Sequence, residues 1–203
     1  GTSIFVSESS SNLILNNMIS VLETGFMYGI YLTSSNSNNV TNNNIQTTGI
    51  FSDGIHLLTS NSNIFTNNTI LTLNANSYGI QLITSPDNII INGSIISIGV
   101  NAYEYSLTES INNNFTNTNF TTRQIYFNDV VSQFNYNNET NGTIWLGTSI
   151  DTYGGMLIQR TLVNWSQTNM IWNDTAQSTL IASYTLNGLL PTTTYYIYVT
   201  ANG

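Results

Sequence analysis

The chain has 203 residues, a length that allows a substantial core and one or two domains. Only 6% of the residues are charged, against about 25% in ordinary globular proteins, and the formal net charge is −8. Lysine is absent and Arg123 and Arg160 are the only arginines, so this composition excludes a phosphate-binding surface for nucleic acid and attraction to anionic membranes.

The absence of cysteine narrows what can hold the fold together. Neither disulfides nor thiolate metal sites are available to a chain without cysteine. The sequence begins Gly1-Thr2-Ser3 without an initiator methionine, and no apolar run approaches the roughly 20 residues of a membrane-spanning helix. We interpret it as a processed or trimmed segment that does not insert into a membrane.

Residues 1–11 are rich in serine after the apolar run Ile4-Phe5-Val6, which predicts half a turn of a coil or a strand that covers its end. Residues 12–33 form a first repeat unit, and further units follow with a period of 25 residues to about Phe127. Such a period indicates stacked supersecondary units, because one unit cannot bury its apolar face alone. The clearest columns are Leu32, Leu57, Leu82 and Leu107; Gly29, Gly54 and Gly79; Ile45, Ile70 and Ile95; and Asn38, Asn63, Asn88 and Asn113.

Within a unit, apolar and polar residues alternate with the period of a strand, as in Gly54-Ile55-His56-Leu57. Turns rich in Asn, Ser, Thr and Gly separate these short runs, and no window has a helical stripe. Wrapping each unit into a coil places equivalent positions about 4.8 Å apart, the spacing of hydrogen-bonded strands. The pattern therefore predicts an all-β protein whose main part is a parallel β-helix of about five turns.

One asparagine column is expected to form a ladder inside the coil. An inward Asn must find hydrogen-bond partners or lose roughly 1–3 kcal/mol, and an Asn stacked on another Asn bonds it amide to amide. Chance is the alternative, since the chain contains 33 asparagines; a chance column would not keep Ile or Phe three residues later in every unit. We assign the ladder to Asn42, Asn67, Asn92 and Asn117.

The repeat motif resembles that of a known superfamily. The runs Asn63-Ile64-Phe65-Thr66-Asn67-Asn68-Thr69-Ile70 and Ser77-Tyr78-Gly79-Ile80-Gln81-Leu82 are similar to repeats of NosD-like and pectate-lyase-like proteins. The resemblance covers residues 12–127 and implies a right-handed parallel β-helix. It also implies either a role in binding or processing polysaccharide or a structural role at a surface, since fold analogy carries little functional weight by itself.

The composition changes after residue 127, which divides the chain into a β-helix at 1–127 and a second part at 128–203. All three tryptophans lie in the second part, and its alternating runs predict a small antiparallel β-sandwich-like module. Its end, with Leu189, Pro191, Thr193 and Tyr195 at alternate positions, resembles the corner motif of fibronectin type III domains. The resemblance implies that Tyr195 is the corner tyrosine, in a module that is reduced or closed by a strand from elsewhere.

Nine Asn-x-Ser/Thr triplets favour an extracellular or cell-surface location, together with the low charge and the missing lysine. Asn67 and Asn92 belong to the proposed inward ladder and are expected to be bare. The seven expected glycosylation sites are Asn39, Asn114, Asn119, Asn138, Asn141, Asn164 and Asn173.

The chain offers few residues for catalysis. Glycosidic cleavage needs two acidic groups about 5–9.5 Å apart, but Asp53 stands in a column of tyrosines, Tyr28, Tyr78 and Tyr103. His56 is three residues from Asp53, and without a second histidine we interpret it as a solvated surface side chain. The tyrosine column is interpreted as packing at a turn, with stacking on sugar rings as the alternative. We predict no catalytic, cofactor or metal site, and we leave a polysaccharide lyase or hydrolase as a minority alternative.

The function that these features favour is a structural cell-surface protein that polymerises through its own strand edges into a filament, sheath or layer. Exposed edges are normally blocked by charge or proline, and the chain has two prolines and no lysine. The alternative is a secreted β-helix that binds or processes carbohydrate. The expected partner is a second copy of the chain, with cell-surface glycans under the alternative.

Overall fold

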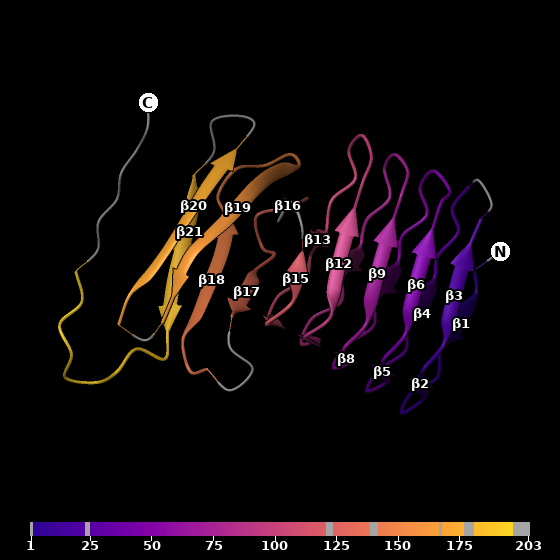
Figure 1. Cartoon of the computed structure of the whole chain (residues 1–203), viewed down its shortest axis with the longest axis horizontal. Coiled ribbons are helices and arrows are strands. Elements are labelled where there is room, and N and C mark those ends of the chain that lie inside the picture. The colour runs from indigo at the N-terminus through magenta and orange to yellow at the C-terminus, as the bar shows by residue number, and fades with distance from the viewer. Residues whose placement is uncertain are drawn as a thin grey trace.

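The computed structural model describes residues 2–22, 25–120, 124–138, 142–166, 168–176 and 181–196, and for Asn119 and Phe120 it describes the backbone only. Every regular element in these residues is a strand, and the strands form three sheets, A, B and C (Figure 1). Sheet A contains, in spatial order, β1 (Ile4–Ser7), β4 (Ile30–Thr33), β7 (Ile55–Leu58), β10 (Ile80–Ile83), β13 (Tyr105–Thr108), β16 (Gln124–Phe127), β19 (Met156–Trp165) and β20 (Met170–Ala176).

Sheets B and C complete the coil. Sheet B contains β2 (Leu13–Leu15), β5 (Asn39–Thr41), β8 (Ile64–Thr66), β11 (Ile89–Ile91), β14 (Asn113–Thr116), β17 (Phe134–Asn137), β18 (Trp145–Ile150) and β21 (Ala182–Asn187). Sheet C contains β3 (Met18–Val21), β6 (Asn44–Thr47), β9 (Thr69–Thr72), β12 (Ser94–Ser97) and β15 (Asn119–Phe120).

Each repeat unit is one turn of a parallel coil, with one strand in each sheet. The register places Leu57 between Leu32 and Leu82, as the leucine column predicts. In Figure 1 the strands of sheet C run upward on the near side and the chain returns on the far side as it advances towards the C-terminus. This sense of winding is right-handed, which is the usual hand of parallel crossovers. The predicted parallel β-helix is confirmed.

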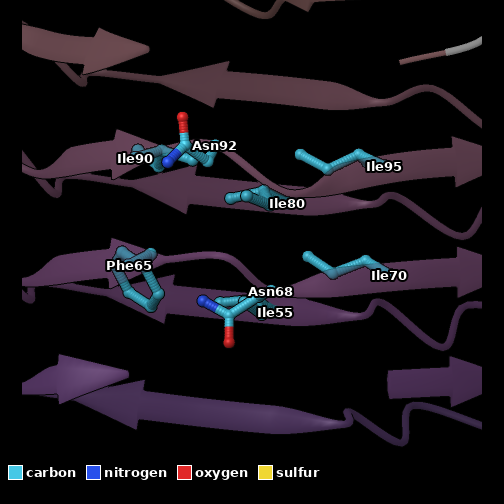
Figure 2. Close-up of a pocket in the computed structure, with 8 residues that line it drawn as sticks. All are labelled: Ile55, Phe65, Asn68, Ile70, Ile80, Ile90, Asn92 and Ile95. Atoms are coloured by element: carbon cyan, nitrogen blue, oxygen red, sulfur yellow. The ribbon is translucent and has the colours of Figure 1, made fainter. Parts of the chain in front are cut away.

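Apolar columns from all three sheets fill the interior of the coil. Ile55, Leu57, Phe65 and Ile70 are each at most 1% exposed, and burying such a side chain stabilises the fold by roughly 1.5–3 kcal/mol. Figure 2 shows three of them, Ile55, Phe65 and Ile70, around a small void inside the coil. This void is only about 10 Å³, about the room that one water molecule needs, so it is too small for a larger ligand.

The buried asparagine ladder lies in two columns other than the predicted one. Asn38, Asn63 and Asn88 are at most 1% exposed. Each donates its backbone N–H and its Nδ2–H to Oδ1 of the asparagine one turn further on, at 2.8–3.1 Å, as far as Asn113. A second row joins Asn17, Asn43 and Asn68 in the same way, at 2.9–3.0 Å. These rows satisfy the backbone where the chain turns between sheets.

The prediction that Asn42, Asn67, Asn92 and Asn117 point inward is wrong. Asn42, Asn67 and Asn117 are exposed and Asn92 is half-buried. All four have a positive φ of 48–55°, a left-handed conformation that Asn adopts more readily than most residues. One left-handed residue interrupts the alternation of a strand, so the following residue, such as Asn43, points inward instead. The column still forms a ladder on the surface, where Asn67 Oδ1 accepts from Asn92 Nδ2 at 3.1 Å and Asn92 Oδ1 accepts from Asn117 Nδ2 at 3.0 Å.

The C-terminal strands extend two of the three sheets. Parallel pairing continues to β17, which ends at Asn137, whereas the sequence placed the division after residue 127. Strands β18 and β19 then pair antiparallel with β17 and β16, and β21 and β20 pair antiparallel with them in turn. The predicted antiparallel region is therefore present, built as a two-layer continuation of sheets A and B (Figure 1).

Arg160 ties these two layers together. Its side chain is 1% exposed and donates to both carboxylate oxygens of Asp174, at 2.9 and 2.6 Å, and to Thr148 Oγ1 at 2.8 Å. The Tyr184 hydroxyl from sheet B donates to the same carboxylate at 2.9 Å. Arg160 thus has a structural role, whereas Arg123 lies outside the described residues.

The predicted fibronectin-like corner contains one local contact. The Leu190 N–H donates to the Tyr195 hydroxyl at 3.0 Å, and residues 188–196 contain no strand.

Nowhere in the described ranges is there a helix long and apolar enough to cross a membrane.

Candidate functional site

The outer face of sheet A carries an open groove that combines aromatic and acidic side chains. The groove lies where the tyrosine column is interrupted, because Asp53 occupies the position between Tyr28 and Tyr78. The Asp side chain is much shorter than that of Tyr, so it leaves a gap between the two rings. The groove has a volume of about 270 Å³ and is lined by Phe26, Tyr28, Phe51, Asp53, Asn76, Tyr78 and Gln81.

Asp53 forms the floor of the groove and is held from two sides. Its Oδ1 accepts the Tyr78 N–H at 2.8 Å, and its Oδ2 lies 2.9 Å from His56 Nδ1. Asp53 is only 3% exposed, and this burial raises the pKa of its carboxyl group, while the hydrogen bond with His56 acts in the opposite direction. The site therefore contains a desolvated carboxyl group with a fixed orientation.

His56 is not the solvated side chain that the sequence predicts. It belongs to the outward column between Tyr31 and Gln81, as expected, but it is only 6% exposed. The Tyr28 ring stacks on it with 4.2 Å between centroids, and the Tyr31 ring meets it edge-on at 5.1 Å. Two tyrosines from the preceding turn therefore cover a histidine that local alternation places on the outside.

The tyrosine column forms stacks along the outer face, as the interpretation of packing at a turn predicts. Tyr78 stacks on Tyr103 at 5.9 Å and Tyr103 on Tyr126 at 5.1 Å. Burial raises the pKa of Tyr28 and of Tyr78 to about 12, and the nearby Asp53 carboxylate adds to both shifts. Both phenols thus remain neutral at physiological pH and can donate hydrogen bonds.

The lining of the groove determines what chemistry it offers. Asp53 is the only carboxyl group among the described lining residues, and acid-base cleavage of a glycoside requires two. No cluster of three metal-ligating side chains occurs in the part of the chain that the structure describes. Aromatic rings beside a carboxyl group and two amides instead provide one flat apolar wall and several hydrogen-bonding groups.

The sequence analysis identified Tyr28, Asp53, Tyr78 and His56 but missed the other residues of the groove. Phe26 and Phe51 stack at 5.2 Å and lie one period apart. The period of 25 residues could have predicted this column, since Asn76 follows Phe51 one period later. The column was missed because it lies in the turn before the strand, where the alternation of inward and outward positions does not apply.

The predicted glycosylation sites lie mostly on the surface. Asn39, Asn138, Asn164 and Asn173 are exposed and Asn114 is half-buried. Asn141 and the side chain of Asn119 lie outside the described part of the chain. Asn67 was expected to carry no glycan because its side chain was predicted to point inward. The structure removes that reason, since Asn67 is exposed.

The ends of sheets A and B form a second candidate surface. Within the described ranges, β1 and β2 at the N-terminal end each pair with a strand on one side only, and β20 and β21 at the other end do the same. The first turn also exposes large apolar side chains: Leu13 is 63% exposed, Met18 87%, Leu22 71% and Phe26 72%. Such an edge with apolar neighbours is a template for pairing with another chain.

Comparison of the chain with protein-family models, curated proteins and solved structures finds no match.

Proposed function

We propose that the chain is a structural protein of the cell surface that assembles with copies of itself into an extracellular filament, sheath or layer. The observation that carries this proposal is the composition of the edge strands. β1, β2 and β21 contain no charged residue and no proline, and in β20 the single charge, Asp174, is neutralised by Arg160. Charge and proline are the usual means by which proteins block such edges.

The exposed apolar side chains of the first turn support the same function. Single exposed apolar residues are ordinary, but a contiguous group indicates an interaction surface. Leu13 and Leu15 project from β2, and Met18 projects from the neighbouring β3. Pairing of the edge strands with another copy would bring apolar surface together beside the new backbone hydrogen bonds.

Composition and repeat type support an extracellular location. Low charge, the absence of lysine and exposed Asn-x-Ser/Thr sites such as Asn39 and Asn164 are consistent with a surface glycoprotein. The NosD-like character of the repeats and the fibronectin-like corner at Tyr195 add to this argument by resemblance. In this proposal the chain has no catalytic activity and no cofactor.

The proposal is tested on the purified 203-residue chain. Light scattering and electron microscopy over a range of protein concentrations are expected to show particles that grow with concentration. A chain that remains monomeric at high concentration contradicts the assembly function.

The groove on sheet A favours a second candidate function, the binding of neutral glycans. Sugar rings stack on aromatic side chains through their apolar faces, while their hydroxyl groups pair with carboxylates and amides. Tyr28, Tyr78, Asp53 and Gln81 provide these groups. The net charge of −8 and the carboxyl group of Asp53 disfavour anionic sugars.

Calorimetric titration with neutral hexose oligosaccharides and with uronate oligosaccharides tests this second candidate. Binding of the neutral probes alone is expected. Tyr78→Ala should abolish it, whereas Tyr103→Ala, in the same tyrosine stack but outside the groove lining, should leave it intact. Equal loss in both variants, or preference for the uronates, contradicts a groove-bound neutral glycan.

A further inference from the structure

We propose that copies of the chain join head to tail, with β20 and β21 of one copy pairing in parallel with β1 and β2 of the next. This inference rests on the proposed assembly function and specifies its contact. The two joined surfaces differ from each other, so the contact is heterologous and continues from copy to copy without closing unless the rotation forms a ring.

Strand direction at the C-terminal end is the first step of the argument. In sheet A, β19 runs antiparallel to β16 and β20 runs antiparallel to β19. In sheet B, β18 and then β21 reverse direction in the same way after β17. Two reversals restore the original direction, so β20 runs parallel to β1 and β21 runs parallel to β2. Both sheets therefore end in a strand that a further parallel coil can extend.

The side chains between the layers provide the second step. At the C-terminal end Trp172 of β20 is half-buried and lies 5.7 Å from the ring of Tyr184 of β21, which is still 42% exposed. At the N-terminal end Ile4 and Val6 of β1 are partly buried against the core. Placing the first turn of one copy on the last strands of another would continue the core and cover the Trp172–Tyr184 pair.

The free edge of β1 provides the third step. Ile4 donates its N–H to Gly29 on the β4 side, and alternate residues of a strand face alternate sides. The backbone groups of Phe5 and Ser7 therefore point away from β4. β1 and β20 run in the same direction and contain no proline, and their one charged residue, Asp174 of β20, is paired with Arg160. They therefore meet the requirements for a parallel pair.

Sheet C has no part in this joint. Its last described strand is β15, well before β20 and β21, so β3 meets no counterpart. Met18, which projects from β3 and is 87% exposed, thus stays at the rim of the joint and not in its centre. The contact therefore uses two sheets of the three.

Cysteine cross-linking tests the contact directly, because the chain contains no native cysteine. Ser7→Cys and Thr175→Cys change exposed residues of β1 and β20. The double variant, treated with a short bismaleimide, is expected to give a ladder of dimers, trimers and longer products, while a mixture of the two single variants gives dimers only. Each single variant alone should assemble but give no cross-linked product, since like ends do not meet.

A second pair of variants separates the contact from folding. Phe5→Lys places a charge on the free edge of β1, where Phe5 is 58% exposed; Ile64→Lys is the control, on the central strand β8, where Ile64 is 41% exposed. Phe5→Lys should raise the concentration needed for assembly at least about ten-fold, equivalent to about 1.4 kcal/mol, while Ile64→Lys leaves it unchanged.

The outcomes distinguish the inference from the function on which it rests. Assembly without cross-linking of the double variant, or dimers from either single variant alone, overturns the head-to-tail contact and leaves the assembly function standing. Absence of assembly in the unmodified chain overturns both. A cross-linked ladder that Phe5→Lys suppresses and Ile64→Lys does not suppress supports both.

Discussion

Replacing Asn63 by alanine tests which asparagine column holds the coil together. Asn63 Oδ1 accepts the backbone N–H of Asn38 at 2.8 Å and the Asn38 Nδ2–H at 2.9 Å. Asn63 Nδ2 in turn donates to Ser35 O and to Asn88 Oδ1, each at 3.1 Å. Alanine removes all four bonds and leaves their partners buried. At roughly 1–3 kcal/mol for each unsatisfied group, and with partial relaxation, the variant should lose about 3–5 kcal/mol of unfolding free energy.

Asn67 provides the matched control, because it belongs to the exposed column in the same turn of the coil. Its φ of 55° would strain alanine, so Asn67→Gly is the suitable change, and it should alter the unfolding free energy by less than about 1 kcal/mol. With a urea slope of roughly 2–3 kcal/mol/M, Asn63→Ala lowers the midpoint by about 1–2 M and Asn67→Gly by far less. Equal shifts, or a larger effect at Asn67, would refute the assignment of the buried ladder.

Four further predictions concern Leu57, His56, Gly54 and Asn67. Leu57→Ala should cost about 2–5 kcal/mol of unfolding free energy in a urea titration. His56→Ala should cost about 1–3 kcal/mol, because it leaves Oδ2 of the buried Asp53 without its partner; no loss at His56 would contradict the buried pair. Gly54→Ala should lower the thermal midpoint, since its Cβ would lie 2.2 Å from Ile70 Cγ2; an unchanged midpoint would mean that the turn shifts at little cost. In a host with N-glycosylation, glycopeptide mass spectrometry should find a glycan on Asn67, and a persistently bare site would speak against its exposure.

The regular part of the fold could be predicted because its columns are uniform. Leu57 has a leucine one period before it and another one period after it, and in a parallel coil such positions become hydrogen-bonded neighbours. The side-chain directions at turns could not be predicted in this way. Asn42 and Asn43 are both asparagines, and only the left-handed backbone at Asn42 decides that the second one points inward.

The groove and the C-terminal strands depend on contacts that a period does not encode. The proximity of His56 to Asp53 was visible in the sequence, but the cover over His56 comes from Tyr28 and Tyr31 of another turn. The antiparallel strands have no repeat to align, so their role as continuations of sheets A and B becomes apparent only from the pairing of β19 with β16 and of β18 with β17.

The pH dependence of stability tests the state of Asp53 itself. Burial raises its pKa above the ordinary value of 3.8, and the bond with His56 offsets part of that shift. Between 3.8 and the raised value, the folded chain holds a proton that the unfolded chain has released. Stability contributed by this group is therefore present at low pH and is lost as the pH rises through that window.

An Asp53→Asn variant isolates this effect, because its amide does not ionise while its size is nearly the same. Urea midpoints of the two proteins measured at pH values from 3.5 upward should show the unmodified chain losing stability relative to the variant as the pH increases. The Tyr28 ring stacks on His56 and does not change charge in this range, because burial raises the pKa of Tyr28 to about 12. If the unmodified chain instead gains stability relative to the variant as the pH rises, the pair with His56 outweighs burial, and the floor of the groove carries an ionised carboxylate.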